Sequence, residues 1–271
     1  MTTTSIKNLK QGSLFAIWCV VAVIAISVQS FAQEPDEADP AKAAQYIRDA
    51  VAVRGGDAFM KVTTVVSRGQ YTGYTKGVSG DPQSFVDYVA YPARERTEFG
   101  KGDSKFVQSN SEAANWVYDG AQKMIRDQKE DQVKQFAQGL RYDLDALLRA
   151  AAKPGANVKV LYAGHREIWR NQFAESVRIE FGDGGVATVN LDPKTKLPLS
   201  AEYKTIGEAG PVSNEVRFYR WVVFSGVNFP TLQDFYRDGK QISRVSIDDV
   251  SINVPLPDKL FAKPMTVKEV K

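Results

Sequence analysis

Residues that commonly carry out catalysis or hold metals are scarce in this chain of 271 residues. Its single histidine, His165, cannot build a histidine-rich metal site, and its single cysteine, Cys19, lies near the N-terminus. Ser79 lacks the flanking glycine spacing of a nucleophile elbow, and no glycine-rich phosphate-binding loop follows a predicted strand. We therefore predict no metal and no cofactor, and we expect His165 either at the surface or as a hydrogen-bonded residue of a turn.

Carboxylates are the remaining candidates for chemistry, since the chain has 32 Asp and Glu residues. The nearest pairs are Asp143 with Asp145, expected on a helix, and Asp248 with Asp249, expected in a strand. Residues two apart on a helix point in different directions, and neighbours in a strand point to opposite faces. Carboxylates distant in sequence could still meet in a cleft, as in a glycosidase, so a hydrolase is the third hypothesis. The sequence favours a protein that is not an enzyme.

The first residues have the pattern of a signal peptide. Two lysines precede an uncharged, mostly apolar stretch, residues 13–28, and small residues Ser30 and Ala32 stand at the positions that signal peptidase reads. We predict that residues 1–32 form a signal peptide, cleaved after Ala32, and that the protein is exported to the periplasm. The alternative is an uncleaved membrane anchor, although the stretch is shorter than the roughly 20 residues that a span needs.

Removal of this segment takes away Cys19 and leaves a chain that cannot form disulfides. Cys19 lies inside the apolar stretch rather than at its end, so lipidation is not expected. We predict a flexible lead-in at residues 33–40 and a single domain over residues 41–271. The formal net charge of +3 is small and no basic tract is present, so we expect no nucleic-acid partner.

Two helices are predicted within this domain. Asp39 can cap a helix that begins at Pro40 and ends at Gly55. A second apolar pattern falls on one face of a helix and ends before Pro154. Its apolar members are Val133, Phe136, Ala137, Leu140, Leu144, Leu147 and Leu148. We predict one continuous helix over residues 133–148, covering the concave face of a sheet.

The rest of the domain has the pattern of about ten strands. In residues 213–253 apolar residues alternate with period two, and Asp238-Gly239 marks a hairpin turn. Phe229-Pro230 is expected to begin a strand, and a slip of apolar phase at Asp248-Asp249 predicts a β-bulge. Strands without alternating crossover helices indicate antiparallel pairing. The predicted fold class is α+β, with a curved, unclosed antiparallel sheet around an N-terminal and a mid-chain helix.

The order of these elements resembles that of the LolA-like superfamily of exported lipoprotein and lipid carriers. Local segments are similar too: residues 91–96 with Pro92 and two arginines, residues 113–120 with Trp116 before a turn, residues 192–198, and residues 227–230. The resemblance covers most of residues 41–263. It implies an unclosed half-barrel with helices as a lid over an apolar cavity.

The resemblance also implies a set of functional residues. An arginine on an early strand holds the lid in the carrier proper, and Arg96 is the nearest match, with Arg94 the other. The aromatic residues can all be explained as ordinary core. On the functional interpretation, the cavity is expected to be lined by Trp116, Phe136, Leu140, Leu144, Leu147 and Trp221.

The predicted function is that of a periplasmic binding protein for transport, similar to outer membrane lipoprotein-sorting proteins. Its partner would be a hydrophobic ligand, either the acyl chain of a lipid or lipoprotein or another apolar molecule, and its contact with membranes would be transient. Envelope proteins are further candidate partners. The alternative is a non-enzymatic envelope interaction or sensor domain, which would have the same fold and a filled core.

Overall fold

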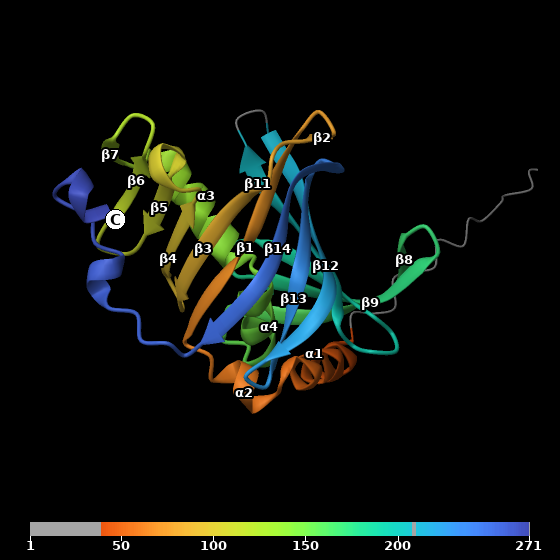
Figure 1. Ribbon diagram of the computed structural model, residues 1–271. Helices are drawn as coiled ribbons and strands as arrows, with labels where there is room; N and C mark the ends of the chain where they lie inside the picture. The colour runs from red at the N-terminus through yellow and green to blue at the C-terminus, as the bar shows by residue number, and fades with distance from the viewer. Residues whose placement is uncertain (1–38, 208–209, 271) are drawn as a thin grey trace, which may run out of the picture. The chain divides into compact units, whose positions relative to one another are not determined.

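Antiparallel pairing of neighbouring strands builds most of the domain (Figure 1). The computed structural model describes residues 39–207 and 210–270, so the predicted signal peptide, its cleavage site and residues 33–38 lie outside the described residues. Within these ranges, fourteen strands form one sheet in the order β7-β6-β5-β4-β3-β1-β14-β13-β12-β11-β10-β9-β8, with the short β2 paired to β1. The path ends at β7 and β8 without closing, which confirms the predicted unclosed antiparallel sheet.

The strands are more numerous than the ten expected. The first half holds β1 (Thr64–Thr75), β2 (Val78–Ser79), β3 (Gln83–Ala90), β4 (Arg94–Phe99), β5 (Phe106–Asn110), β6 (Asn115–Asp119) and β7 (Met124–Asp127). The second half holds β8 (Val158–Trp169), β9 (Gln172–Phe181), β10 (Val186–Leu191), β11 (Pro198–Gly207), β12 (Gly210–Phe224), β13 (Val227–Arg237) and β14 (Lys240–Ile252). Short 3₁₀ turns are η1 (Gly102–Ser104), η2 (Asp258–Leu260) and η3 (Val267–Val270).

The predicted turn and bulge near the C-terminal strands are both confirmed. Asp238 and Gly239 have φ angles of 48° and 73°, as a tight hairpin turn between β13 and β14 requires. Along β1, Arg68 pairs with Asp249 and Gly69 with Ile247, so Asp248 is the extra residue of a bulge. A Cβ at position 69 would lie 1.9 Å from the Ser246 carbonyl oxygen, so the bulge needs glycine there. The bulge returns Val250 to the inner face that Ile247 also occupies.

Pro230 lies inside β13 rather than at its start, which corrects the prediction. The strand begins at Val227, after a turn at Ser225-Gly226 with φ angles of 48° and 81°. The proline is tolerated because β14 pairs with β13 only from Leu232 onward, so no ladder bond to β14 is lost at position 230.

The N-terminal helix is confirmed, whereas the mid-chain helix is broken into two. The helix α1 (Pro40–Arg54) begins at Asp39, whose carboxylate accepts hydrogen bonds from the backbone N–H groups of Ala41 and Lys42 at 2.9 and 3.0 Å. It is followed by the short α2 (Asp57–Met60). The predicted continuous helix is wrong, because α3 (Glu130–Arg141) ends before α4 (Leu144–Ala152) begins.

The cause of the break is Asp143. Its carboxylate accepts the backbone N–H of Asp145 at 2.9 Å and that of Ala146 at 3.4 Å, and so caps α4. The carboxylate of an aspartate can accept hydrogen bonds from nearby backbone N–H groups in place of the helical carbonyl oxygens. Aspartate is therefore more favourable at the N-terminal cap of a helix than in its interior.

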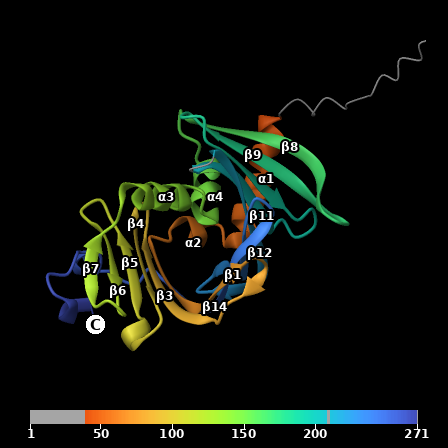
Figure 2. The same ribbon diagram turned by 90° about the horizontal axis from the view of Figure 1, so that it is seen from above.

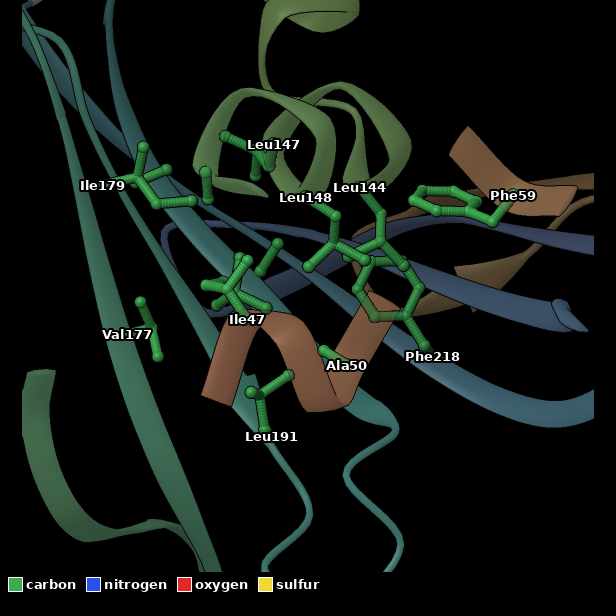
Figure 3. Close-up of a cluster of buried hydrophobic side chains, with 14 of the residues drawn as sticks. Ile47, Ala50, Phe59, Leu144, Leu147, Leu148, Val177, Ile179, Leu191 and Phe218 are labelled. Carbon is green, nitrogen blue, oxygen red and sulfur yellow. The ribbon is translucent and has the colours of Figure 1, made fainter. Parts of the chain in front are cut away.

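Figure 2 shows the sheet bending around α1, α3 and α4. The helices α1 and α4 pack against each other and against the inner face of β8 to β13, and Figure 3 shows Ile47 and Ala50 facing the leucines of α4. Leu147 and Leu148 are fully buried, and burial of each contributes about 1.5–3 kcal/mol relative to an exposed side chain. By contrast, no residue of α3 is fully buried.

A second, smaller cluster lies on the outer face of β5 and β6, and we call it the outer cluster. Its buried members are Val107, Trp116, Tyr118 and Val270. The chain after β14 crosses this face, and the buried Phe261 accepts hydrogen bonds through its carbonyl oxygen from Trp116 Nε1 at 3.0 Å and from Ser109 Oγ at 3.2 Å. The C-terminal segment therefore covers the outside of the sheet, away from the helices.

Candidate ligand-binding cavity

A cavity of about 400 Å³ separates α3 from the inner face of β1, β3, β4, β13 and β14. Most of its wall is apolar. The lining residues are Ser67, Tyr71, Phe85, Asp87, Val89, Tyr91, Glu95, Thr97, Phe99, Phe136, Gly139, Leu140, Asp143, Gln233, Phe235, Val245 and Ile247. The volume falls within the range of about 300–1,000 Å³ typical of small-molecule sites.

The helical period of α3 and the two-residue period of the strands bring these side chains to the cavity wall. On the helical side, Phe136, Gly139, Leu140 and Asp143 are spaced i, i+3, i+4 and i+7, which is one face of a helix continued into its cap. On the sheet side, alternate residues of each strand face inward, as with Phe85, Asp87 and Val89 of β3. The cavity is therefore a direct product of α3 lying over the sheet.

Three carboxyl groups face this apolar space from different elements. Asp87 on β3 accepts a hydrogen bond from Thr97 Oγ1 at 2.8 Å, and Glu95 on β4 lies 3.3 Å from the same hydroxyl group. Asp143 reaches the cavity from the break between α3 and α4. Among the lining residues there is no lysine, arginine or histidine.

The pKa values of these carboxyl groups reflect that environment. Burial raises the pKa of Asp87 from 3.8 to about 6. Desolvation by the surrounding protein and then the nearby charge of Asp145 raise the pKa of Asp143 to about 6 as well, although Asp143 is an exposed residue. Burial and then the charges of Asp87 and Asp143 hold the pKa of Glu95 well above its ordinary value. Perturbed carboxylates in a cavity are a feature of functional sites.

A buried ion pair lies next to the cavity and joins three elements. Arg54 at the end of α1 donates from Nη2 to Asp145 Oδ1 at 2.6 Å and from Nε to the Asn228 carbonyl oxygen at 2.6 Å. Tyr91, which also lines the cavity, donates its hydroxyl hydrogen to Asp145 Oδ2 at 3.3 Å. Arg54 forms no ion pair with the carboxyl groups of the cavity, although its charge lowers the pKa of Asp143.

Some of the residues predicted to line a cavity lie on its wall, and others are packed in the core. Phe136 and Leu140 lie on its wall. Leu144 and Leu147 lie on α4, beyond the break at Asp143, and belong to the packed core between α4 and the sheet. Trp221 packs at the border of that core, with its ring 5.3 Å from the guanidinium carbon of Arg54. Whether Phe136 and Leu140 contact a ligand stays a prediction.

Trp116 and Arg96 lie on the outer face of the sheet. Trp116 is fully buried in the outer cluster and is absent from the cavity wall. Arg96 donates from Nη1 to the Leu260 carbonyl oxygen at 2.8 Å and pairs with Glu98 at 2.7 Å, so its partners are a β4 neighbour and the C-terminal segment. Arg94 is likewise paired, with Asp258 of that segment at 2.5 Å. Neither arginine contacts α3 through these bonds.

Sequence reasoning missed the three cavity carboxyl groups as a set. Asp87 stands among apolar residues of its strand, and a charged residue in such a position is a usable signal. Glu95 lies between Arg94 and Arg96 and gives no such signal. Nothing in the sequence, however, shows that these positions face the same space as Asp143, because that depends on strand register and on the helix break.

His165 lies at the surface, one of the two positions expected for it, but within β8 and not in a turn. The strand continues past a register shift between Tyr162 and His165, so the hairpin with β9 is longer than predicted. The imidazole is exposed, lies 3.0 Å from Glu175 Oε1 through Nδ1, and stacks on Phe173. Across residues 39–207 and 210–270, no group of three or more acidic, histidine or cysteine side chains could hold a metal ion. Within the same ranges, no helix is long and apolar enough to cross a membrane.

Fold and cavity together define an unclosed antiparallel half-barrel with helices lying in its concave face. Solved structures share this arrangement. The chain is similar to a DUF1329 family protein from Desulfovibrio piger, with 17% identity, a TM-score of 0.56 and coverage of 83% of this chain and 98% of that one. It is similar to a LolA superfamily protein from Nitrosomonas europaea, with 13% identity, a TM-score of 0.51 and coverage of 82% and 97%.

A third similar structure is a putative outer membrane lipoprotein-sorting protein domain from Vibrio parahaemolyticus, with 12% identity, a TM-score of 0.50 and coverage of 83% and 98%. The sequence matches no family model and no curated protein. At these identities the likeness concerns the fold. The chain has the LolA-like fold, as the resemblance in its sequence predicts.

Proposed function

We propose that this protein binds an apolar chain, such as the acyl chain of a lipid or lipoprotein, in the cavity beneath α3, and that it acts as a carrier in the periplasm. The observation that supports this best is the apolar cavity itself. A helix covers it that has no fully buried residue of its own, whereas α4, next along the chain, is packed into the core.

The energy of such binding is sufficient without specific polar contacts. Each methylene group removed from water contributes about 0.8 kcal/mol, so eight of them contribute roughly 6 kcal/mol. The walls that would receive them include Phe85, Phe99, Phe136, Leu140 and Phe235. A site of this kind needs no sequence motif, in keeping with the scarcity of motifs in this chain.

The periplasmic location rests on the pattern of residues 1–32, read as a signal peptide cleaved after Ala32. A solved structure with the same fold is described as a putative outer membrane lipoprotein-sorting protein domain, which supports a role in handling acylated molecules. On this proposal the protein is not an enzyme, and it meets membranes only while loading or releasing its ligand.

One observation favours the alternative of an envelope interaction domain without a ligand. Leu144 and Leu147, expected on a cavity wall, are packed against α1 and the sheet, so part of the interior is filled. The alternative predicts that the space beneath α3 takes up no apolar molecule.

A variant with a filled cavity distinguishes a ligand-binding protein from an interaction domain without a ligand. Gly139 lies between Phe136 and Leu140 on the cavity side of α3, and a Cβ there would meet no heavy atom within 4 Å. Gly139→Leu should therefore occupy the cavity without strain. Ala137→Leu is the matched control, since Ala137 is an exposed position of the same helix.

The assay is binding of the neutral fluorescent dye N-phenyl-1-naphthylamine, at neutral pH. We expect binding by the unmodified protein, a loss of at least about tenfold in affinity for Gly139→Leu, and little change for Ala137→Leu. Absence of dye binding by the unmodified protein, or equal binding by the Gly139→Leu variant, would contradict a ligand site beneath α3.

A further inference from the structure

The polar part of the cavity beneath α3 has one sign of charge. Its ionisable lining residues are Asp87, Glu95 and Asp143, together with the phenols of Tyr71 and Tyr91. The other polar lining residues, Ser67, Thr97 and Gln233, are neutral. An apolar space of ligand size therefore carries up to three negative charges on its wall.

These carboxyl groups have few hydrogen-bond donors. The single hydrogen of the Thr97 hydroxyl can serve Asp87 at 2.8 Å or Glu95 at 3.3 Å, but not both at once. Asp143 uses one carboxylate oxygen, Oδ1, to cap α4. Each carboxylate can accept several hydrogen bonds, so much of their accepting capacity is directed at the cavity.

No cation forms an ion pair with them in the part of the chain that the structure describes, although the charge of Arg54 acts on Asp143 from a distance. Among the residues that the structure describes, no ion pair within 4.0 Å includes any of the three. The charged neighbours on adjoining elements are already engaged: Arg54 with Asp145, and Arg149 with the carbonyl oxygens of Val62 and Phe59. On the outer face, Arg96 and Lys105 both pair with Glu98.

Asp87 and Glu95 are half-buried without an ion-pair partner, which disfavours ionisation and raises their pKa values. The pKa of the more exposed Asp143 is raised by desolvation and by the charge of Asp145. A positively charged head group entering the cavity would supply the missing counter-ion and up to several hydrogen bonds. A carboxylate head group would meet like charge, and a hydroxyl group could donate a hydrogen bond but would bring no positive charge.

We propose that the cavity beneath α3 is selective for amphiphiles with a cationic head group, such as an alkylammonium ion, whose head lies against Asp87, Glu95 and Asp143 and whose chain lies against the apolar wall. This inference rests on the proposed function and specifies the chemistry of its ligand. It makes the three carboxyl groups specificity-determining residues of the site.

Three dodecyl compounds that differ only in head group test the selectivity. Dodecylammonium, dodecanol and dodecanoate are titrated against the bound naphthylamine dye at pH 8 and low salt, below their micelle-forming concentrations. We expect dodecylammonium to bind at least tenfold more tightly than dodecanol, and dodecanoate to bind most weakly. The preference should shrink as salt is added, since screening weakens the attraction between charges.

The double variant Asp87→Asn/Glu95→Gln keeps the size of both side chains and removes their charge. We expect it to bind dodecanol as the unmodified protein does and to lose most of the preference for dodecylammonium. Asp249→Asn is the control, because Asp249 pairs with Arg68 on the outer face with 56% of its side chain exposed.

Proton release gives a second measurement that needs no variant. At pH 6 a cationic ligand should expel protons from the carboxyl groups that it meets, which calorimetry in two buffers of different ionisation enthalpy detects. Dodecanol should release none.

The outcomes separate this inference from the proposed function. If all three compounds bind equally, or if the double variant keeps the full preference for the cation, the inference is overturned while the apolar site stands. If none of them displaces the dye and the dye itself does not bind, the site and the inference fail together. Binding of dodecylammonium without proton release at pH 6 would also overturn the inference.

Discussion

Replacing Asp87 by asparagine should stabilise the protein at pH 8, although the substitution removes a charged residue from a hydrogen-bonded position. Asp87 lies under α3 with no cation beside it, and ionisation there costs free energy that the unfolded chain does not incur. Asparagine keeps the shape and the oxygen that accepts the hydrogen bond from Thr97 Oγ1. The substitution therefore removes the cost and retains the contact.

The magnitude follows from the pKa of Asp87, which rises from 3.8 to about 6 on folding. Each pKa unit corresponds to about 1.4 kcal/mol, so the cost of ionising the folded protein is at most about 3 kcal/mol. Access of solvent to this half-buried side chain reduces the cost, and we expect a gain of about 1–3 kcal/mol. Because the folded state binds the proton more tightly, this contribution to stability is full below pH 3.8 and is lost as the pH rises through about 6.

The assay is urea denaturation followed by tryptophan fluorescence at pH 8 and at pH 4. The variant should have a higher free energy of unfolding than the unmodified protein at pH 8 and nearly the same one at pH 4. Asp249→Asn, on the outer face, should change neither value by more than about 0.5 kcal/mol. An Asp87→Asn variant that is less stable at pH 8, or equally stabilised at both pH values, would refute the account of an uncompensated buried carboxyl group.

Three further predictions concern the frame around the cavity. Arg54→Met should lower the free energy of unfolding in urea by about 3–5 kcal/mol, because it leaves the buried Asp145 without its cation. Adding Asp145→Leu should restore most of that stability, and a double variant that recovers none of it would contradict the ion pair as the cause. Phe261→Ala should lower the free energy of unfolding by about 3–5 kcal/mol, since the residue is only 2% exposed. It should also shift tryptophan emission to the red, because the segment of Phe261 covers Trp116; unchanged emission would contradict this. Gly69→Ala should destabilise the protein by about 1–3 kcal/mol, because its Cβ would lie 1.9 Å from a carbonyl oxygen. Gly139→Ala, with open space around it, should stabilise α3 by about 1 kcal/mol. Thermal melts in which Gly69→Ala is the more stable of the two variants would contradict this explanation.

Much of the fold could be predicted from local patterns. The alternation of apolar residues, the Asp238-Gly239 turn and the slip of phase at Asp248 predicted antiparallel strands and a bulge, because strand period and turn geometry depend on neighbouring residues alone. The helix capped by Asp39 was predicted for the same reason.

Periodicity could not distinguish a broken mid-chain helix from a continuous one. The apolar residues keep a 3.6-residue spacing through position 143, and only the cap hydrogen bonds of Asp143 show that the chain ends one helix and begins another there. The consequence is large, since α4 fills the core while α3 is left above a cavity.

Local patterns were sufficient to predict the antiparallel sheet, its principal turns and the apolar faces of the helices, because each follows from side-chain period and backbone preference over a few residues. Tertiary structure alone decided which of those faces are packed and which border open space. It also decided that Asp87, Glu95 and Asp143 meet there, since residues from β3, β4 and a helix cap become neighbours only through strand register and the placing of α3 across the sheet.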